Sequence, residues 1–203
     1  MRFNWRDFLF HFALKPREAG SHLLNFKLTN IQLIQLSVLA ICLLTIFRFL
    51  IIATYGSSLT DSIDMQNMQS NQMEIFQILK LITPINIVYT LFILFLARAV
   101  ALTFFGRMFG GRGTFRETVL FLASFDIIHS ILLAILFISL WVLPVIITDI
   151  FMLLGSILMV WISTNLIQVL HKFNNLMFVF FGLIAGYLSL AVFFLFIVLV
   201  FSK

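Results

Sequence analysis

The chain has 203 residues, of which 62% are hydrophobic and only 10% are charged, and its formal net charge is +5. A mean hydropathy of +1.13 lies far outside the range of soluble globular proteins. This composition excludes a soluble folded module and predicts an all-α integral membrane protein. Because one span needs roughly 20 apolar residues, we expect a single bundle domain of about five transmembrane helices.

Residues 1–30 are predicted to form a short amphipathic interfacial segment that precedes the bundle on the cytoplasmic side. Four apolar side chains fall on one face at helical spacing: Trp5, Phe8, Leu9 and Phe12. A second short helix is expected from Pro16, because proline is tolerated in a first helical turn. A basic anchor for anionic lipid and a partner-docking helix both fit this segment.

Three long apolar regions divide into five predicted spans. Pro84 predicts a tilt or kink near the start of the second span. The apolar run from Thr118 to Leu170 is too long for one helix, and Pro144 with Asp149 predicts a turn inside it. The expected spans are 31–55, 75–105, 118–141, 150–170 and 176–201.

The distribution of Lys and Arg predicts how the bundle is oriented. Basic residues precede the first span and occupy the connectors between the second and third spans and between the fourth and fifth. The opposite connectors, residues 56–74 and the turn at Pro144, contain neither Lys nor Arg. The positive-inside rule therefore places the amino terminus in the cytoplasm and the carboxy terminus outside. No cleavable signal peptide is expected, because the first apolar run is too long for one.

The connector GRMFGGRGTFRE, residues 106–117, interrupts the apolar chain with four glycines and three arginines. Thr114 and Glu117 have the spacing of a capping box that starts the third span. Glycine permits the left-handed or close-approach backbone of a sharp turn, which is the structural interpretation of Gly110, Gly111 and Gly113.

The same connector is a candidate binding site for an anionic lipid headgroup or an acidic partner. Three cations lie next to backbone amides at a helix start, namely Arg107, Arg112 and Arg116. A nucleotide-binding loop is not expected, because the Walker spacing and its Lys-Ser/Thr pair are missing.

Two sequence segments resemble the Yip (Ypt-interacting protein) family of membrane proteins. They are Pro16-Arg17-Glu18-Ala19 before the first span and Gly110-Gly111-Arg112-Gly113-Thr114-Phe115 after the second. The resemblance implies five spans with a cytoplasmic amino terminus over nearly the whole chain. Eukaryotic members are associated with Rab-type GTPases, membrane curvature and early secretory traffic. This chain is more similar to the bacterial members, which implies a location in the bacterial inner membrane.

The third span carries two ionisable residues near its middle, Asp126 and His129, spaced i and i+3 on one helical face. An Asp at a helix centre costs about 2.5–3.5 kcal/mol on insertion scales, so it should face the bundle, be protonated or pair. A polar clamp between helices and a proton-responsive or cation site both remain open. No metal site is expected. Arg48, Lys80 and Arg98 are expected to reach span ends by snorkelling.

No enzyme motif is found, and no cofactor is expected: HExxH, GxSxG and a Cys-His pair are all missing from the sequence. The predicted function is non-enzymatic organisation of membrane or partner proteins through the basic connector. The alternative is a small transporter or channel-like protein that uses Asp126 and His129. Expected partners are the lipid bilayer, a membrane or cytoplasmic protein and a second copy, but not nucleic acid. Gly182 and Gly186 permit close helix approach, which fits packing within the bundle better than it fits a dimer contact.

Overall fold

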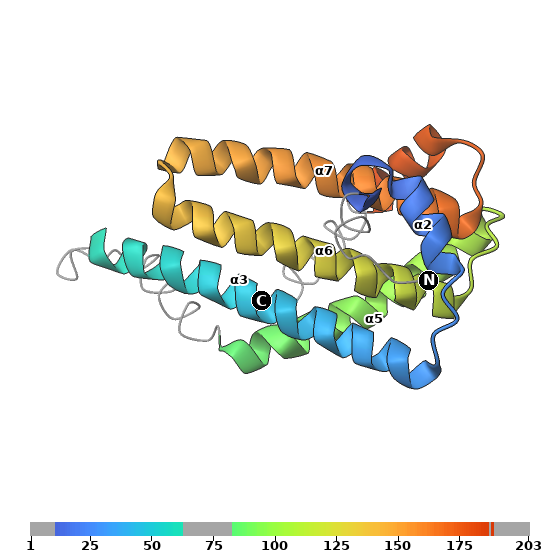
Figure 1. Cartoon of the computed structure of the whole chain (residues 1–203), viewed down its shortest axis with the longest axis horizontal. Helices are drawn as coiled ribbons and strands as arrows, with labels where there is room; N and C mark the ends of the chain where they lie inside the picture. Colours follow the sequence, from blue (N-terminus) through green and yellow to red (C-terminus); the bar gives the residue numbers. More distant parts are fainter. Residues whose placement is uncertain (1–10, 63–82, 187, 189–203) are drawn as a thin grey trace, which may run out of the picture.

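The computed structural model describes residues 11–62, 83–186 and 188, and each element in that part is a helix (Figure 1). The named elements are α2 (Pro16–Leu24), α3 (Asn30–Ser62), α5 (Pro84–Met108), α6 (Phe115–Val142) and α7 (Val145–His171). Among the described residues, four helices are long and apolar enough to cross a membrane: Asn30–Thr54, Pro84–Met108, Phe115–Val142 and Ile146–His171. This is the architecture of a multi-pass helical membrane protein.

The expected fifth span, 176–201, lies largely outside the described residues. Its first part forms the apolar helix Leu176–Gly186, which by itself is shorter than a span. A Cβ atom placed on Gly182 would meet no described atom within 4 Å, so this glycine makes no close helix contact in the described part. The count of five spans stays a prediction.

The predicted start of the second span, residue 75, lies outside the described residues. α5 begins at Pro84 in the described part. Thr83 caps this helix, because its hydroxyl accepts a hydrogen bond of 3.3 Å from the Asn86 backbone N–H. The tilt or kink expected at Pro84 stays a prediction, because it also depends on residues 75–82. Proline suits the first helical position, where its missing N–H would have no intrahelical partner.

The turn between the third and fourth spans occurs at Pro144, as expected, but it is tighter than predicted. α6 ends at Val142 and α7 begins at Val145, so the predicted helix start at residue 150 is wrong. The Pro144 carbonyl already accepts hydrogen bonds from the next turn of backbone N–H groups. Asp149 consequently lies on the exposed side of α7 rather than in the turn.

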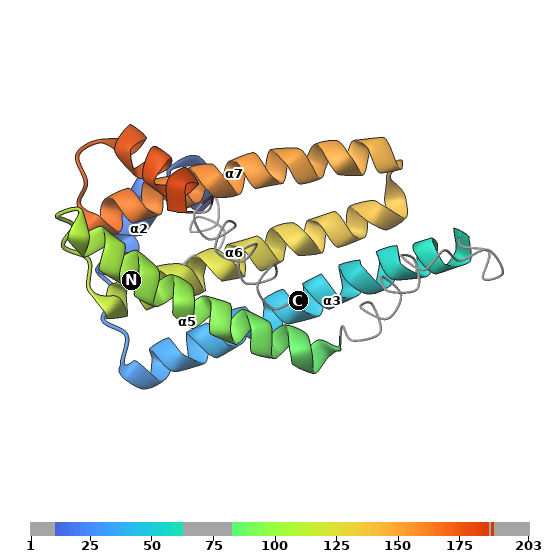
Figure 2. The same cartoon turned by 180° about the vertical axis from the view of Figure 1, so that it is seen from behind.

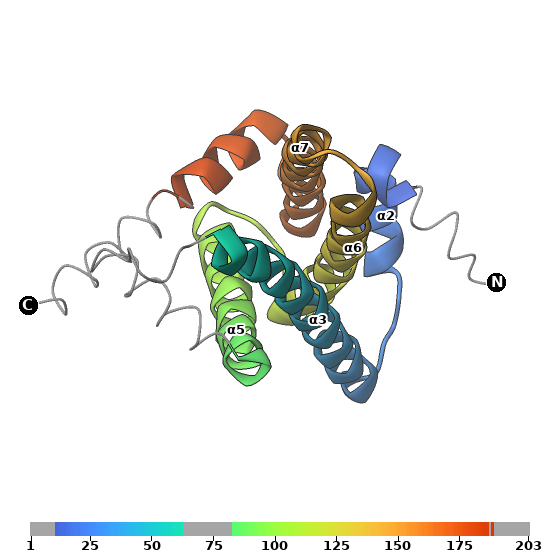
Figure 3. The same ribbon diagram turned by 90° about the vertical axis from the view of Figure 1, so that its left-hand side faces the viewer.

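α6 is the central helix of the bundle, since it packs against α3, α5 and α7 (Figures 2 and 3). One apolar cluster joins it to α2 and α7, and a second joins it to α3 and α5. In the second cluster three alanines, one from each helix, are completely buried: Ala40, Ala99 and Ala123. Small residues at such contacts let membrane helices approach closely, which gains van der Waals packing.

α2 packs its apolar face on the bundle instead of leaving it for lipid. Ala19 and Leu23 are buried against α6 and α7, and Phe12, just before α2, is buried in the same cluster. Arg17 donates a hydrogen bond of 3.0 Å from Nε to the buried side chain of Asn165 on α7. The interfacial position predicted for residues 1–30 stays a prediction, and Trp5, Phe8 and Leu9 lie outside the described residues.

The basic connectors gather at one end of the molecule. α2, the connector after α5 and the residues after α7 lie together at that end, and the turn at Pro144 lies at the other (Figure 1). Among the described residues, the turn at Pro144 carries no Lys or Arg, whereas the end with α2 and the connector after α5 carries several. We call the first one the basic end, meaning α2, residues 107–117 and residues 171–175.

Candidate functional site

The start of α6 is fixed by the hydrogen bonds of a capping box. The Thr114 backbone N–H donates to Glu117 Oε2 over 2.8 Å, and the Glu117 N–H donates to Thr114 Oγ1 over 3.3 Å. The Glu117 carboxylate thus occupies one of the amide groups that an anion at this helix start would use. Binding of a ligand here has to depend on the arginine side chains rather than on that amide.

The end of α5 is equally well defined. The Gly110 N–H bonds to the Arg107 carbonyl at 3.0 Å, and the Gly111 N–H bonds to the Gly106 carbonyl at 2.8 Å. With Gly110 at a φ of 82°, this is a Schellman motif, in which a glycine in the left-handed region ends the helix. The expected left-handed conformation is present at Gly110.

Close approach explains the other glycines of the connector. The imidazole of His171 is 1% exposed and lies against Gly106, Gly111 and Gly113. A Cβ on these residues would come within 2.0, 2.7 and 2.9 Å of the His171 side chain, respectively, distances that no folded protein tolerates without movement. The connector therefore wraps around the last side chain of α7, and we call this arrangement the His171 cradle.

Further contacts tie the connector to α7 and to the helix that follows. The Arg112 N–H donates to the His171 carbonyl over 3.3 Å. Phe178 packs edge-to-face on Phe109, with ring centroids 5.6 Å apart, and on Phe173, with centroids 5.9 Å apart. Neither ring nitrogen of His171 has a well-formed hydrogen bond to any described residue, although the Leu102 backbone interacts with the ring.

The three connector arginines differ in what they contact. Arg107 Nε donates to the Gly113 carbonyl over 3.3 Å, and Arg116 Nη2 donates to the Leu28 carbonyl between α2 and α3. The Arg112 side chain is exposed and makes no hydrogen bond or ion pair with the described residues. One nitrogen each of Arg107 and Arg116 therefore supports the backbone, and Arg112 is fully available to a ligand.

Deeper in the bundle, Asp126 pairs with Arg98 rather than with His129. Arg98 Nη1 donates to Asp126 Oδ1 over 3.1 Å and Nη2 donates to Oδ2 over 2.6 Å, which is a bidentate ion pair between α5 and α6. Asp126 is 0% exposed. His129 is half-buried and packs near Phe125, and no hydrogen bond or ion pair joins its side chain to Asp126 in the described part.

The snorkelling expected of Arg98 is therefore wrong. At about 1.5 Å per residue, Arg98 lies about 15 Å from the end of α5 and Asp126 about 16 Å from the start of α6. Half the thickness of a hydrocarbon core is also about 15 Å, so the pair lies near the midplane. Arg48 on α3 is near enough to interact electrostatically with both groups, and three charges from three helices consequently meet there.

A second polar contact joins the same two helices nearer the basic end. The Thr103 hydroxyl donates to the Ala99 carbonyl over 2.8 Å and lies 3.0 Å from the Thr118 hydroxyl, both residues being buried. Together with the ion pair, it holds α5 against α6 along their shared face. The polar clamp is thus the interpretation that the geometry around Asp126 favours. The described residues include no group of three or more His, Cys, Asp or Glu side chains that could hold a metal ion.

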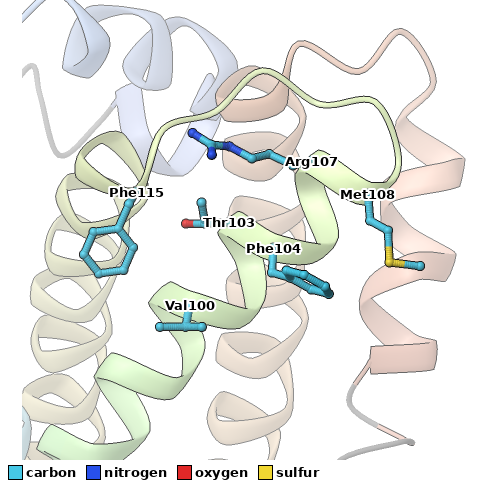
Figure 4. A pocket seen from close by; sticks show the side chains of 6 residues that line it. All are labelled: Val100, Thr103, Phe104, Arg107, Met108 and Phe115. Atoms are coloured by element: carbon cyan, nitrogen blue, oxygen red, sulfur yellow. The ribbon is translucent and has the colours of Figure 1, made fainter.

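Beside the Thr103 contact, an open groove of about 520 Å³ runs between the end of α5 and the start of α6 (Figure 4). Six residues line it: Val100, Thr103, Phe104, Arg107, Met108 and Phe115. Its walls are mostly apolar, and its one charged residue is Arg107.

Comparisons with known proteins leave the family open. No protein-family model matches the chain, and neither a curated protein nor a solved structure gives a match. The resemblance to the Yip family stays a prediction based on residues 16–19 and 110–115, so function has to be argued from the site itself.

Proposed function

We propose that this chain is a non-enzymatic multi-span membrane protein of the bacterial Yip type, and that it docks an acidic partner protein on its basic end. The observation that carries the proposal is the exposed Arg112 on a connector that the rest of the fold holds rigid. The capping box holds the end of residues 106–117 at α6, the Schellman motif holds the end at α5, and the His171 cradle packs the connector against α7. A rigid surface loses little conformational entropy when a partner binds, and this favours recognition.

The charge of this end supports the same function. Arg107 and Arg116 lie on either side of Arg112, and all three side chains are exposed. The described acidic side chain of the connector, Glu117, is engaged in the helix cap. An excess of positive charge steers acidic partners and accelerates their association. It also fits a cytoplasmic orientation in a bacterial inner membrane, which is part of the proposal.

The alternative function, transport through Asp126 and His129, receives less support. Both oxygens of Asp126 are bonded to Arg98, and the residue is completely buried. A transport step would have to break this bidentate pair in each cycle. A residue that holds two helices together in the resting structure is better suited to stability than to transfer of a proton or ion.

Site-specific photo-crosslinking in intact cells tests the proposal. A photoreactive amino acid at Phe109, whose ring is 55% exposed at the basic end, should capture a discrete protein band. The same amino acid at Trp141, which is 72% exposed near the opposite end of the bundle, is the matched control. The Phe109 band should weaken strongly when Arg112 is changed to Gln. Capture of lipid alone at Phe109, or equal bands at both sites, would overturn the proposal.

A further inference from the structure

The groove between α5 and α6 combines mostly apolar walls with one arginine at its connector end, which is the polarity that a phospholipid headgroup and an acyl chain require. Val100, Phe104 and Phe115 offer apolar walls and are 58%, 61% and 46% exposed, although hydrophobic side chains of soluble proteins are usually covered. Thr103, the polar residue of the lining besides Arg107, already uses its hydroxyl for Ala99 and Thr118. An apolar chain can therefore lie in the groove without leaving a buried polar group unpaired.

Arg107 provides the polar end of this site. It lies in the last turn of α5, where the apolar span ends and lipid headgroups begin. Its Nε is held by the Gly113 carbonyl, and Figure 4 shows its side chain extending past Thr103 beneath the connector. No hydrogen bond links its two terminal nitrogens to a described residue. A guanidinium held by one edge presents its other nitrogens to a phosphate in a defined geometry.

The spacing along α5 fits a lipid molecule. Val100 lies two helical turns before Arg107, which is about 10 Å deeper in the membrane. A phosphate at Arg107 would let one acyl chain pass Phe104 and Val100 towards the bilayer centre. Met108, 66% exposed at the mouth, is flexible enough to adapt to a headgroup.

We propose that this groove binds an anionic phospholipid, with its phosphate on Arg107 and an acyl chain along Val100, Phe104 and Phe115. The inference rests on the proposed function in placing this end of the bundle at the cytoplasmic, anionic leaflet. It adds a lipid site beside the partner surface around Arg112. A bound lipid would extend the basic end with a fixed headgroup and would stabilise the contact of α5 with α6.

Fluorescence quenching in vesicles tests this site with the full-length protein. Phe104 is replaced by Trp after Trp5, Trp141 and Trp161 have been changed to Phe, so that one indole reports from the groove. Vesicles of phosphatidylcholine then contain a small, equal fraction of brominated phosphatidylglycerol or brominated phosphatidylcholine. One cation near anionic lipid contributes about fivefold in relative binding, equivalent to about 1 kcal/mol. We expect the phosphatidylglycerol to be about fivefold enriched at the indole.

Two variants separate the groove from the general charge of the surface. Arg107→Gln should remove most of the enrichment and Arg107→Lys should retain most of it, whereas Arg112→Gln, outside the groove, should reduce it by a much smaller factor. Equal quenching by the two lipids in the parent protein would overturn the lipid site. Equal losses with Arg107→Gln and Arg112→Gln would overturn it too, because they would indicate only a diffuse surface field. The crosslinked protein band at Phe109 is an independent measurement of the partner surface. Failure of the lipid site and failure of the partner surface can therefore be distinguished.

Discussion

Removing one partner of the buried ion pair should destabilise the protein unequally, depending on which charge is left. Asp126 is completely buried, whereas the side chain of Arg98 retains 30% of its exposure. In Arg98→Ala the carboxylate stays at the membrane midplane without its partner, which should cost about 3–5 kcal/mol in the free energy of unfolding. In Asp126→Ala the group that remains is the partly exposed guanidinium, which keeps more solvation than a buried carboxylate would, so the loss should be about half as large.

The double variant Arg98→Leu/Asp126→Leu separates charge from packing. It leaves no charge of the pair unpaired, and it should recover most of the stability that Arg98→Ala loses. The free energy of unfolding can be measured by sodium dodecyl sulfate titration in mixed micelles, with helicity as the readout. Arg112→Leu, which removes an arginine without an ion pair in the described part, is the matched control and should unfold like the parent.

The double variant Arg98→Ala/Asp126→Ala, made with the same substitutions as the single variants, completes a double-mutant cycle for the ion pair. The coupling between residues 98 and 126 should be larger than about 1.5 kcal/mol, because the two groups touch and share a buried site. Additive single-variant losses would refute the ion pair as a contributor to stability. Equal losses for Arg98→Ala and Asp126→Ala would refute the reasoning from their different burial.

Two smaller perturbations test the connector. Gly106→Ala should lower the midpoint of thermal unfolding by several degrees, because its Cβ would lie 2.0 Å from the His171 ring. The control Gly155→Ala places a Cβ that meets no described atom within 4 Å, so it should be neutral or stabilising. A midpoint in Gly106→Ala that equals or exceeds that of the parent would contradict the His171 cradle. Thr114→Ala should lower the free energy of unfolding by about 1 kcal/mol, because it removes the cap of α6. Glu117→Ala should lower it by a similar amount, since both changes break the same capping box. An unchanged free energy of unfolding in Thr114→Ala would exclude a contribution of the cap to stability.

Local features of the connector could be predicted from the sequence because each one depends on neighbouring residues. The spacing of Thr114 and Glu117 determines a cap, and a glycine after the last turn determines a helix end at Gly110. The positions of the apolar runs likewise predicted the long helices. After Pro144 the predicted helix start at residue 150 was wrong by five residues, because a proline in an apolar run shows that a turn occurs but not how short it is.

Contacts between distant residues could not be predicted in this way. Arg98 was assigned to a span end by its position in the apolar run, but its partner Asp126 is on the next helix, and only the packing of α5 on α6 brings them together. The number of glycines near residue 110 is the one feature of the sequence that indicates a close contact of this connector with another group. Nothing in the sequence indicated that this group would come from the end of α7.

The most direct test of the proposed function compares the yield of the Phe109 crosslink in two variants of the same cells. We expect Arg112→Gln to lose most of the partner band and Arg98→Leu/Asp126→Leu to keep it, because docking depends on the basic end and not on charges at the midplane. The opposite result, a band that survives loss of Arg112 but disappears with the neutral pair, would contradict the docking function. Such a result would favour transport through Asp126 and His129 instead.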